Sequence, residues 1–84
     1  MPQVLMYTKT HCGYCTRARK LLERKGVEFT EVPIDHDRAA ERLMVERSHR
    51  HTVPQIFIDD RHIGGYTDLA ALDSCGELDT LLGR

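Results

Sequence analysis

The sequence predicts an α/β protein whose elements follow in the order βαβαββα and form a four-stranded mixed sheet flanked by helices. The apolar run Val4-Leu5-Met6-Tyr7 is typical of a buried strand. A helical pattern follows it and leads into a second β-rich stretch, so the first two strands should be parallel and joined by a right-handed crossover. Two short β-rich runs on either side of Asp59-Asp60 predict an antiparallel hairpin on the other side of the sheet.

The first helix and the strand after it are defined by an apolar face, a glycine and a proline. The helical face is formed by Cys15, Ala18, Leu21 and Leu22. Gly26 is placed to end this helix as its C′ residue. The β-rich stretch 27–34 contains Pro33, which cannot donate to a ladder, so this strand is expected at a sheet edge.

A second helix is expected after this strand, with Asp35 or Asp37 as its N-cap. Its inner face is predicted to consist of Ala39, Ala40, Leu43 and Met44. The side chains of this face should pack on the sheet.

The C-terminal part predicts the hairpin and the last helices. The hairpin strands are 55–58 and 61–63, and Gly64-Gly65 then turns the chain. Thr67 or Asp68 is expected to cap a third helix. Leucines continue the helical pattern to the end of the chain: Leu69, Leu72, Leu78, Leu81 and Leu82. The complete pattern is the outline of a thioredoxin-like core.

The composition excludes several classes of protein. The 84 residues are enough for one small domain, residues 1–84, and the net charge of −1 gives no reason to expect nucleic acid or an anionic membrane as a partner. No apolar run is long enough to cross a bilayer, and the start of the chain lacks the features of a signal peptide. Three cysteines are a poor disulfide framework for a secreted protein. We therefore expect a cytoplasmic protein.

Cys12-Gly13-Tyr14-Cys15 lies between the first strand and the first helix and is the strongest indication of chemistry. The first turn of a helix has unpaired N–H groups and the positive end of the helix dipole, and both stabilise an anion. A thiolate at Cys12, with Lys9 and His11 close by in sequence, is therefore expected to be the nucleophile. Cys15 follows one turn later on the apolar face, where it is protected and can resolve a mixed disulfide.

The same cysteine spacing is also half of a zinc site. His49 and His51 are the nearest candidates for the two further ligands that zinc needs. The sequence has no second Cys-x-x-Cys pair. Redox chemistry is therefore the better interpretation, with zinc as the alternative.

Two other segments are suited to binding a ligand. In Thr52-Val53-Pro54, the proline either simply starts a strand or forms a cis bond that presents the Val53 backbone to an extended ligand. In Gly64-Gly65-Tyr66-Thr67-Asp68, a helix N-terminus can bind a carboxylate and Asp68 can bind an ammonium. These are the two charges of an amino-acid headgroup, although a capped helix after a turn explains the same residues.

Taken together, these segments resemble the glutaredoxin family, particularly its short bacterial dithiol members. The resemblance extends over nearly the whole chain and is carried, in order, by Tyr7-Thr8-Lys9, Cys12-Gly13-Tyr14-Cys15, Thr52-Val53-Pro54-Gln55-Ile56-Phe57-Ile58, Ile63-Gly64-Gly65 and Asp68-Leu69. It implies a thioredoxin-like fold with a cis proline facing the active site. It also implies a glutathione-dependent enzyme that reduces protein disulfides and glutathionylated thiols.

The resemblance further implies a role for individual residues. Cys12 forms the mixed disulfide and Cys15 resolves it. The implied glutathione-binding residues are Lys9, Tyr14, Thr52, Val53, Pro54, Gly65, Thr67 and Asp68. Among them, Lys9 reaches the glycine carboxylate, and Thr67 and Asp68 take the γ-glutamyl end. The implied partners are glutathione and disulfide-containing clients such as ribonucleotide reductase, and the chain is expected to be a monomer.

The sequence departs from the family pattern at two places near the site. Gly13 replaces the proline of the usual Cys-Pro-Tyr-Cys, and a small residue there is associated in the family with dimers that share a [2Fe–2S] cluster. A cluster-bridged dimer with Cys12 and glutathione as ligands is therefore the alternative function. Glu41 stands where the family often has another polar or basic contact to the glycine carboxylate, with Arg38 or Arg42 as candidates to replace it.

Two further residues fall outside the implied site. Tyr66 occupies a position where a cysteine or another residue is common in the family. Cys75 lies at the edge of the third helix's apolar face, between Asp73 and Glu77. Because a helix C-terminus and two carboxylates disfavour a thiolate, we expect Cys75 to be an unreactive packing residue.

Overall fold

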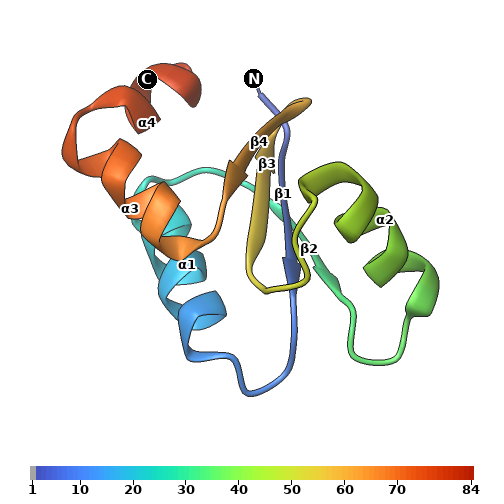
Figure 1. Ribbon diagram of the computed structural model, residues 1–84. Helices are drawn as coiled ribbons and strands as arrows, with labels where there is room; N and C mark the ends of the chain where they lie inside the picture. Colours follow the sequence, from blue (N-terminus) through green and yellow to red (C-terminus); the bar gives the residue numbers. More distant parts are fainter. Residues whose placement is uncertain (1) are drawn as a thin grey trace.

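A four-stranded mixed sheet with the strand order β2-β1-β3-β4 lies at the centre of the computed structural model, which describes residues 2–84 (Figure 1). The strands are β1 (Val4–Thr8), β2 (Thr30–Pro33), β3 (Gln55–Ile58) and β4 (Arg61–Gly64). β1 is parallel to β2 and antiparallel to β3, and β3 and β4 form the hairpin. The predicted mixed sheet and the edge position of the strand containing Pro33 are confirmed, although this strand is shorter than the predicted stretch 27–34.

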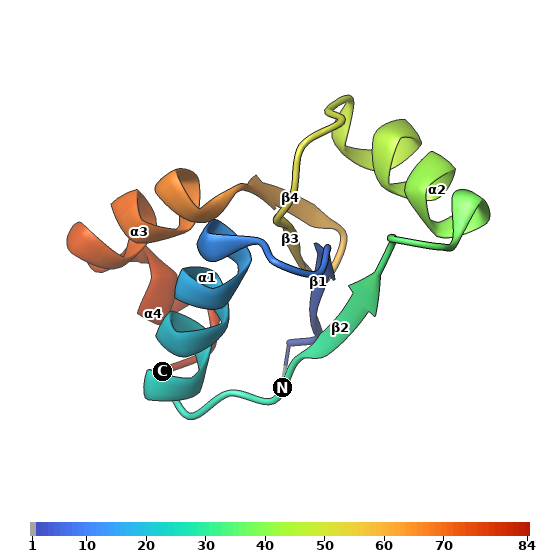
Figure 2. The same ribbon diagram turned by 90° about the horizontal axis from the view of Figure 1, so that it is seen from below.

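Helices cover both faces of the sheet. They are α1 (Gly13–Arg24), α2 (Arg38–Ser48), α3 (Tyr66–Ser74) and α4 (Glu77–Leu81). In the view from below, α1, α3 and α4 lie on one side of the sheet and α2 lies alone on the other (Figure 2). Within residues 2–84, no helix has the length and apolar character needed to cross a membrane.

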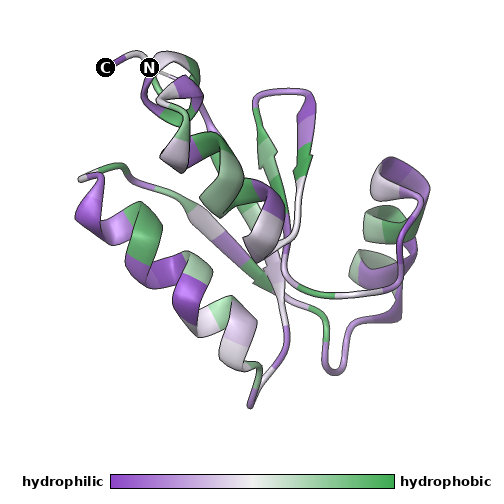
Figure 3. Ribbon diagram, turned by 60° about the vertical axis from the view of Figure 1, so that its left-hand side comes forward, coloured by the Kyte–Doolittle hydropathy of each residue, from purple (hydrophilic) through white to green (hydrophobic). Residues whose placement is uncertain are grey.

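The alternation of side chains along the strands divides the core into two clusters. In the β1–β3 register, Met6 is opposite Ile56, and both belong to the cluster beneath α1, α3 and α4. Tyr7 and Phe57 point to the other face, where they pack with Ile34 and Met44 beneath α2. Hydrophobic and hydrophilic segments alternate along the helices, as expected when each helix covers the core on one side only (Figure 3).

Helix α1 ends as the sequence predicts. Gly26 has a φ of +69°, a conformation that glycine adopts without strain. Its N–H donates to the Glu23 carbonyl at 2.9 Å, and the Val27 N–H donates to the Leu22 carbonyl at 3.4 Å. This pair of bonds is a Schellman motif, and it directs the chain toward β2. The predicted apolar face of α1 is also confirmed, because Cys15, Ala18, Leu21 and Leu22 are all buried.

Helix α2 is capped by Asp37, whose Oδ1 accepts from the Ala40 N–H at 2.9 Å, but its predicted inner face is partly wrong. Ala39 is exposed and Leu43 is 47% exposed. The inward-facing stripe instead passes through the half-buried Ala40 and the buried Met44 and Ser48, which follow one another at intervals of four residues. The Ser48 hydroxyl enters this stripe because it donates to the Met44 carbonyl at 2.7 Å, which satisfies it within the helix.

Candidate active site

Cys12 is the N-cap residue of α1. Its backbone is extended (φ −103°, ψ 107°), and its Sγ accepts a hydrogen bond from the Cys15 N–H at 3.2 Å. The Sγ also lies 3.9 Å from the Val53 carbonyl oxygen. This sulfur therefore lies at the N-terminus of α1, where it accepts from a free N–H group at the positive end of the helix dipole.

Cys15 lies in the opposite environment. It is 1% exposed and belongs to the buried face of α1. Burial, together with the hydrogen bond to Cys12, raises the pKa of the Cys15 thiol to about 12. Both cysteines are free thiols in this structure. The pair therefore consists of an accessible sulfur at a helix N-terminus and a protected, protonated one.

A groove of about 330 Å³ opens beside this pair. Its lining residues come from the start of α1, the segment before β3 and the start of α3: Tyr14, Arg50, Thr52, Val53, Pro54, Gly65, Tyr66, Thr67 and Asp68. Every predicted glutathione-binding residue except Lys9 is among them. The Val53–Pro54 peptide bond is cis, as the resemblance implies.

The start of α3 differs in detail from the predicted capping. Gly65 is the N-cap, so Thr67 is not, and Asp68 is the third helical residue. The Asp68 Oδ2 accepts from the Gly65 N–H at 2.9 Å and from Arg50 Nη1 at 3.0 Å. The Gly65 N–H and the Arg50 guanidinium hold the pKa of Asp68 below its usual value. Asp68 is thus a fixed carboxylate at the positive end of a helix.

Two groove residues, Arg50 and Tyr66, carry no implied role in the sequence analysis. Arg50 lies in the connection after α2 and pairs with Asp68, so the groove contains a cation beside its anion. Tyr66 stacks on Tyr14 with ring centroids 6.2 Å apart, and Arg17 lies over the Tyr14 ring at 5.4 Å. The sequence does not single out Arg50, because it stands in a run of basic residues and each of them is equally well explained as a solvated surface charge.

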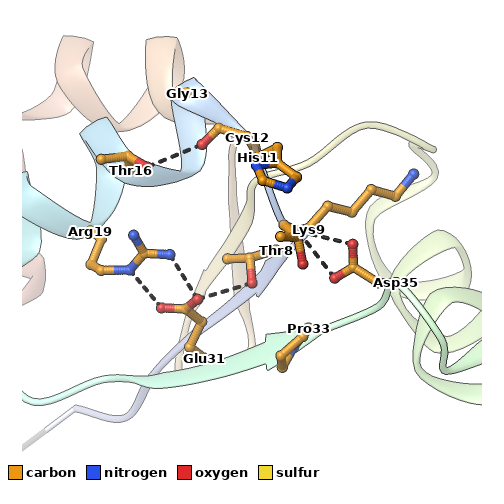
Figure 4. A pocket seen from close by; sticks show the side chains of 11 residues that line it. Thr8, Lys9, His11, Cys12, Gly13, Thr16, Arg19, Glu31, Pro33 and Asp35 are labelled. Atoms are coloured by element: carbon orange, nitrogen blue, oxygen red, sulfur yellow. Dashed lines mark hydrogen bonds and ion pairs between the residues drawn. The ribbon is translucent and has the colours of Figure 1, made fainter.

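Lys9 lines a second cavity, of about 610 Å³, which Cys12 also lines (Figure 4). The Asp35 carboxylate accepts from the Thr10 N–H there, at 2.9 Å and 3.1 Å, which lowers the pKa of Asp35. Glu31 receives two hydrogen bonds of 2.8 Å from Arg19 and one of 3.1 Å from the Thr8 hydroxyl. This network joins α1, β1 and β2 directly below the active-site turn.

The remaining candidates from the sequence lie away from the two cavities. Of the described residues, neither the candidate carboxylate contacts on α2 (Arg38, Glu41 and Arg42) nor the candidate zinc ligands (His49 and His51) line either one. Across residues 2–84, no three His, Cys, Asp or Glu side chains gather as a metal site. Cys75 is exposed at the C-terminal end of α3, so its expected role as a packing residue is wrong. The chain turns into α4 at Gly76, which leaves the Cys75 side chain outside the core.

Comparison with known proteins gives a consistent result. The glutaredoxin family model matches residues 4–63. The chain is 57% identical over 82 residues to glutaredoxin 3 of Escherichia coli K12, covering 98% of this chain and 99% of that protein. It is 45% identical over 82 residues to a glutaredoxin of Pseudomonas aeruginosa, covering 98% of both.

Solved structures agree with the sequence relatives. The structure of glutaredoxin from Brucella melitensis is similar with a TM-score of 0.86 at 48% identity, covering 100% of this chain and 94% of that chain. A buckwheat glutaredoxin–glutathione complex is similar with a TM-score of 0.89 at 28% identity, covering 98% of this chain and 77% of that chain.

Proposed function

Since the chain belongs to the glutaredoxin family and is therefore a glutathione-dependent thiol–disulfide oxidoreductase, we propose that Cys12 and Cys15 carry out its reaction. The observation that carries this proposal is the contrast between the two sulfurs. Cys12 is at the accessible N-terminus of α1, and Cys15 is buried with a raised pKa. Only a thiolate attacks a disulfide efficiently, so Cys12 attacks first.

With a glutathionylated protein as substrate, the Cys12 thiolate attacks the glutathione sulfur. A Cys12–glutathione disulfide forms, and the protein thiolate leaves and takes up a proton. A second glutathione thiolate then attacks the mixed disulfide, which releases oxidised glutathione and restores Cys12. This route needs one protein thiol.

With a protein disulfide as substrate, attack by Cys12 forms a mixed disulfide with the client. Cys15 loses its proton and attacks the Cys12 sulfur, so the client leaves as a dithiol and a Cys12–Cys15 disulfide forms. Two glutathione molecules reduce this disulfide and become oxidised glutathione. This route needs both cysteines.

The groove beside Cys12 suits glutathione. An extended cysteinyl segment can pair with the Val53 backbone beside the Cys12 Sγ, and Thr52 flanks it. The γ-glutamyl carboxylate fits the N-terminus of α3 at Gly65 and Thr67, and Asp68 binds the ammonium. Tyr14 and Pro54 line the groove, and Lys9 takes the glycine carboxylate from the cavity that it shares with Cys12.

Several further parts of the proposal rest on the resemblance and the composition. We propose that the protein is a monomer and that its clients include ribonucleotide reductase. We also propose that it is located in the cytoplasm, where glutathione keeps thiols reduced. The comparisons do not favour the alternative of a cluster-bridged dimer held by Cys12. Dithiol chemistry requires a second thiol such as the buried Cys15. A cluster ligated by Cys12 and glutathione would leave Cys15 unused.

The test is a coupled assay with glutathione, glutathione reductase and either a glutathionylated peptide or a protein disulfide. Cys12→Ser should abolish turnover of both substrates. Cys15→Ser should retain turnover of the glutathionylated peptide and lose that of the protein disulfide. Cys75→Ser is the matched control and should behave as wild type. Equal losses from Cys12→Ser and Cys15→Ser on both substrates would refute the assigned roles.

A further inference from the structure

Gln55 is a fully buried polar residue at the start of a strand whose other members are apolar. Its Nε2 donates to the Thr52 carbonyl oxygen at 3.0 Å and lies 3.2 Å from the Thr52 Oγ1. Its Oε1 lies 2.7 Å from the Nε2 of His62 on β4. A buried amide is costly unless it is hydrogen-bonded, so the contacts with Thr52 and His62 are what make this position acceptable for glutamine.

The direction of each hydrogen bond follows from the chemistry of the groups. The Thr52 carbonyl only accepts, so the NH₂ group of Gln55 must face Thr52, and Oε1 must face His62. Because Oε1 only accepts, His62 must carry a hydrogen on Nε2. The His62 ring packs against Phe57, its cross-strand neighbour, with ring centroids 5.0 Å apart.

These bonds determine what Thr52 offers to a ligand. Its Oγ1 accepts from Gln55, so its own hydroxyl hydrogen is directed away from Gln55. Thr52 and Val53 both line the groove, and the Val53 carbonyl lies beside the Cys12 Sγ. A single buried amide therefore sets both the carbonyl and the hydroxyl of the residue that precedes Val53.

We infer that His62 is a positioning residue for glutathione: through Gln55, it fixes the orientation of Thr52 and of the adjoining Val53 backbone. His62 does not itself line the groove. The inference rests on the proposed function, in which Thr52 and Val53 bind glutathione. It explains a chain of polar contacts that runs from the half-buried His62 on β4 through the buried Gln55 on β3 to Thr52 at the groove.

The experiment compares two substitutions of His62. His62→Phe keeps an aromatic ring against Phe57 and removes the donor, whereas His62→Gln keeps a donor nitrogen at a similar reach. His62→Phe should raise the KM for a glutathionylated peptide about fivefold, the effect of one lost hydrogen bond, with little change in kcat. His62→Gln should restore most of the wild-type KM. His36→Phe changes an exposed histidine before α2 and is the control, with unchanged KM.

A double-mutant cycle separates positioning from general packing. Gln55→Met should raise KM at least as much as His62→Phe, and combining the two should add little, because His62 acts through Gln55. Without glutathione, NMR order parameters of the Thr52 and Val53 amides should fall in His62→Phe and stay high in His62→Gln. If His62→Phe does not fold, His62→Asn replaces it, because its shorter amide does not reach Gln55.

Equal KM values for His62→Phe and His62→Gln would overturn the inference. So would a His62→Phe variant that loses thermal stability while its KM and order parameters stay as in wild type. Absence of glutathione-dependent turnover in the wild-type protein would instead refute the proposed function. The order parameters at Thr52 and Val53 would still decide whether His62 positions this segment.

Discussion

The sulfur atoms of Cys12 and Cys15 are three residues apart in sequence but differ in exposure and hydrogen bonding. The reason is that Cys12 precedes helix α1 and Cys15 lies inside it. Cys12 has an extended backbone, so its Sγ meets the free N–H groups of α1. Cys15 is on the apolar side of the same turn and is desolvated. The order of reaction that we propose thus follows from the position of each residue relative to the first helical turn.

The raised pKa of Cys15 predicts a pH-dependent loss of stability. Its pKa is about 12 in the folded protein against an ordinary value of 9.0, so between these values the unfolded chain releases a proton that the folded chain retains. The free energy of unfolding therefore falls as pH rises through this window. Cys15→Ala lacks this contribution. In urea unfolding under reducing conditions, the stability difference between wild type and Cys15→Ala should shrink from about pH 8 to about pH 11. A constant difference would contradict the prediction.

Asp68 combines a structural bond to Gly65 with a charge that faces the groove, and two substitutions separate these contributions. Asp68→Asn keeps an oxygen that accepts from the Gly65 N–H and removes the charge, so it should raise the KM for a glutathionylated peptide about fivefold with little loss of stability. Asp68→Ala should raise KM similarly and also destabilise the protein by about 0.5–1 kcal/mol through the lost cap. Steady-state kinetics and thermal unfolding measure the two effects. Unchanged KM in Asp68→Asn would place the ammonium elsewhere.

At the level of elements, glycine occupies the first position of α1, where proline would be favoured. Gly13 is helical, and a Cβ built on it meets no atom within 4 Å. Cys12 before it already has the extended backbone that a following proline requires. Proline is favoured at the first position of a helix, where the N–H has no helical partner. The fold would therefore accept proline at position 13, and glycine leaves the backbone there with more conformational freedom than the folded structure needs.

Gly13→Pro should stabilise the protein by about 0.4–1 kcal/mol, because it restricts the unfolded chain without straining the folded one. For a domain of this size, this corresponds to a rise of about 2–6 °C in Tm. Gly64→Ala is the opposite case: Gly64 has a φ of +117°, and a Cβ there would collide with the Asp68 carboxylate. It should lower Tm and disturb the groove. A lower Tm in Gly13→Pro would show that the glycine relieves strain at the active-site turn.

The same elements show how far the sequence alone could lead. The strand order, the Gly26 stop and the buried face of α1 follow from local patterns of apolar residues, glycine and proline. The predicted inner face of α2 omits Ser48, because a serine is expected outside and this one is buried with its hydroxyl satisfied inside the helix. The Arg50–Asp68 pair joins residues 18 apart in sequence, and the Gln55–His62 bond crosses a hairpin. Polar partners of this kind depend on tertiary geometry, which no local periodicity encodes.

In the whole molecule, the sheet separates two layers of unequal thickness. On one face, Lys25 at the end of α1 forms ion pairs with Asp73 (2.6 Å) and Asp79 (3.0 Å), which link α1 to α3 and α4 over the larger core cluster. Among the helices of residues 2–84, α2 is the only one on the other face (Figure 2). Its buried Met44 packs in the smaller core cluster, and the Arg47 guanidinium lies 4.1 Å from the centre of the Phe57 ring.

This asymmetry predicts that α2 opens before the rest of the protein and that its opening affects the groove. Met44 is fully buried, so Met44→Ala should cost about 2–5 kcal/mol. Hydrogen exchange should show lower protection in α2 than in α1, and Met44→Ala should widen this difference. Because Arg50 and Thr52 directly follow α2, the variant should also raise the KM for a glutathionylated peptide.

Leu78→Ala is the matched control, since it truncates an equally buried residue in the larger cluster. It should destabilise the protein by a similar amount, yet leave both α2 protection and KM close to wild type, because α4 contributes nothing to the groove. Rates of alkylation at Cys12 should be unchanged in both variants, since neither touches the start of α1. If both variants raised KM equally, or if α1 and α2 exchanged together in Met44→Ala, the two layers would open as one unit, and the proposed coupling between α2 and the groove would be wrong.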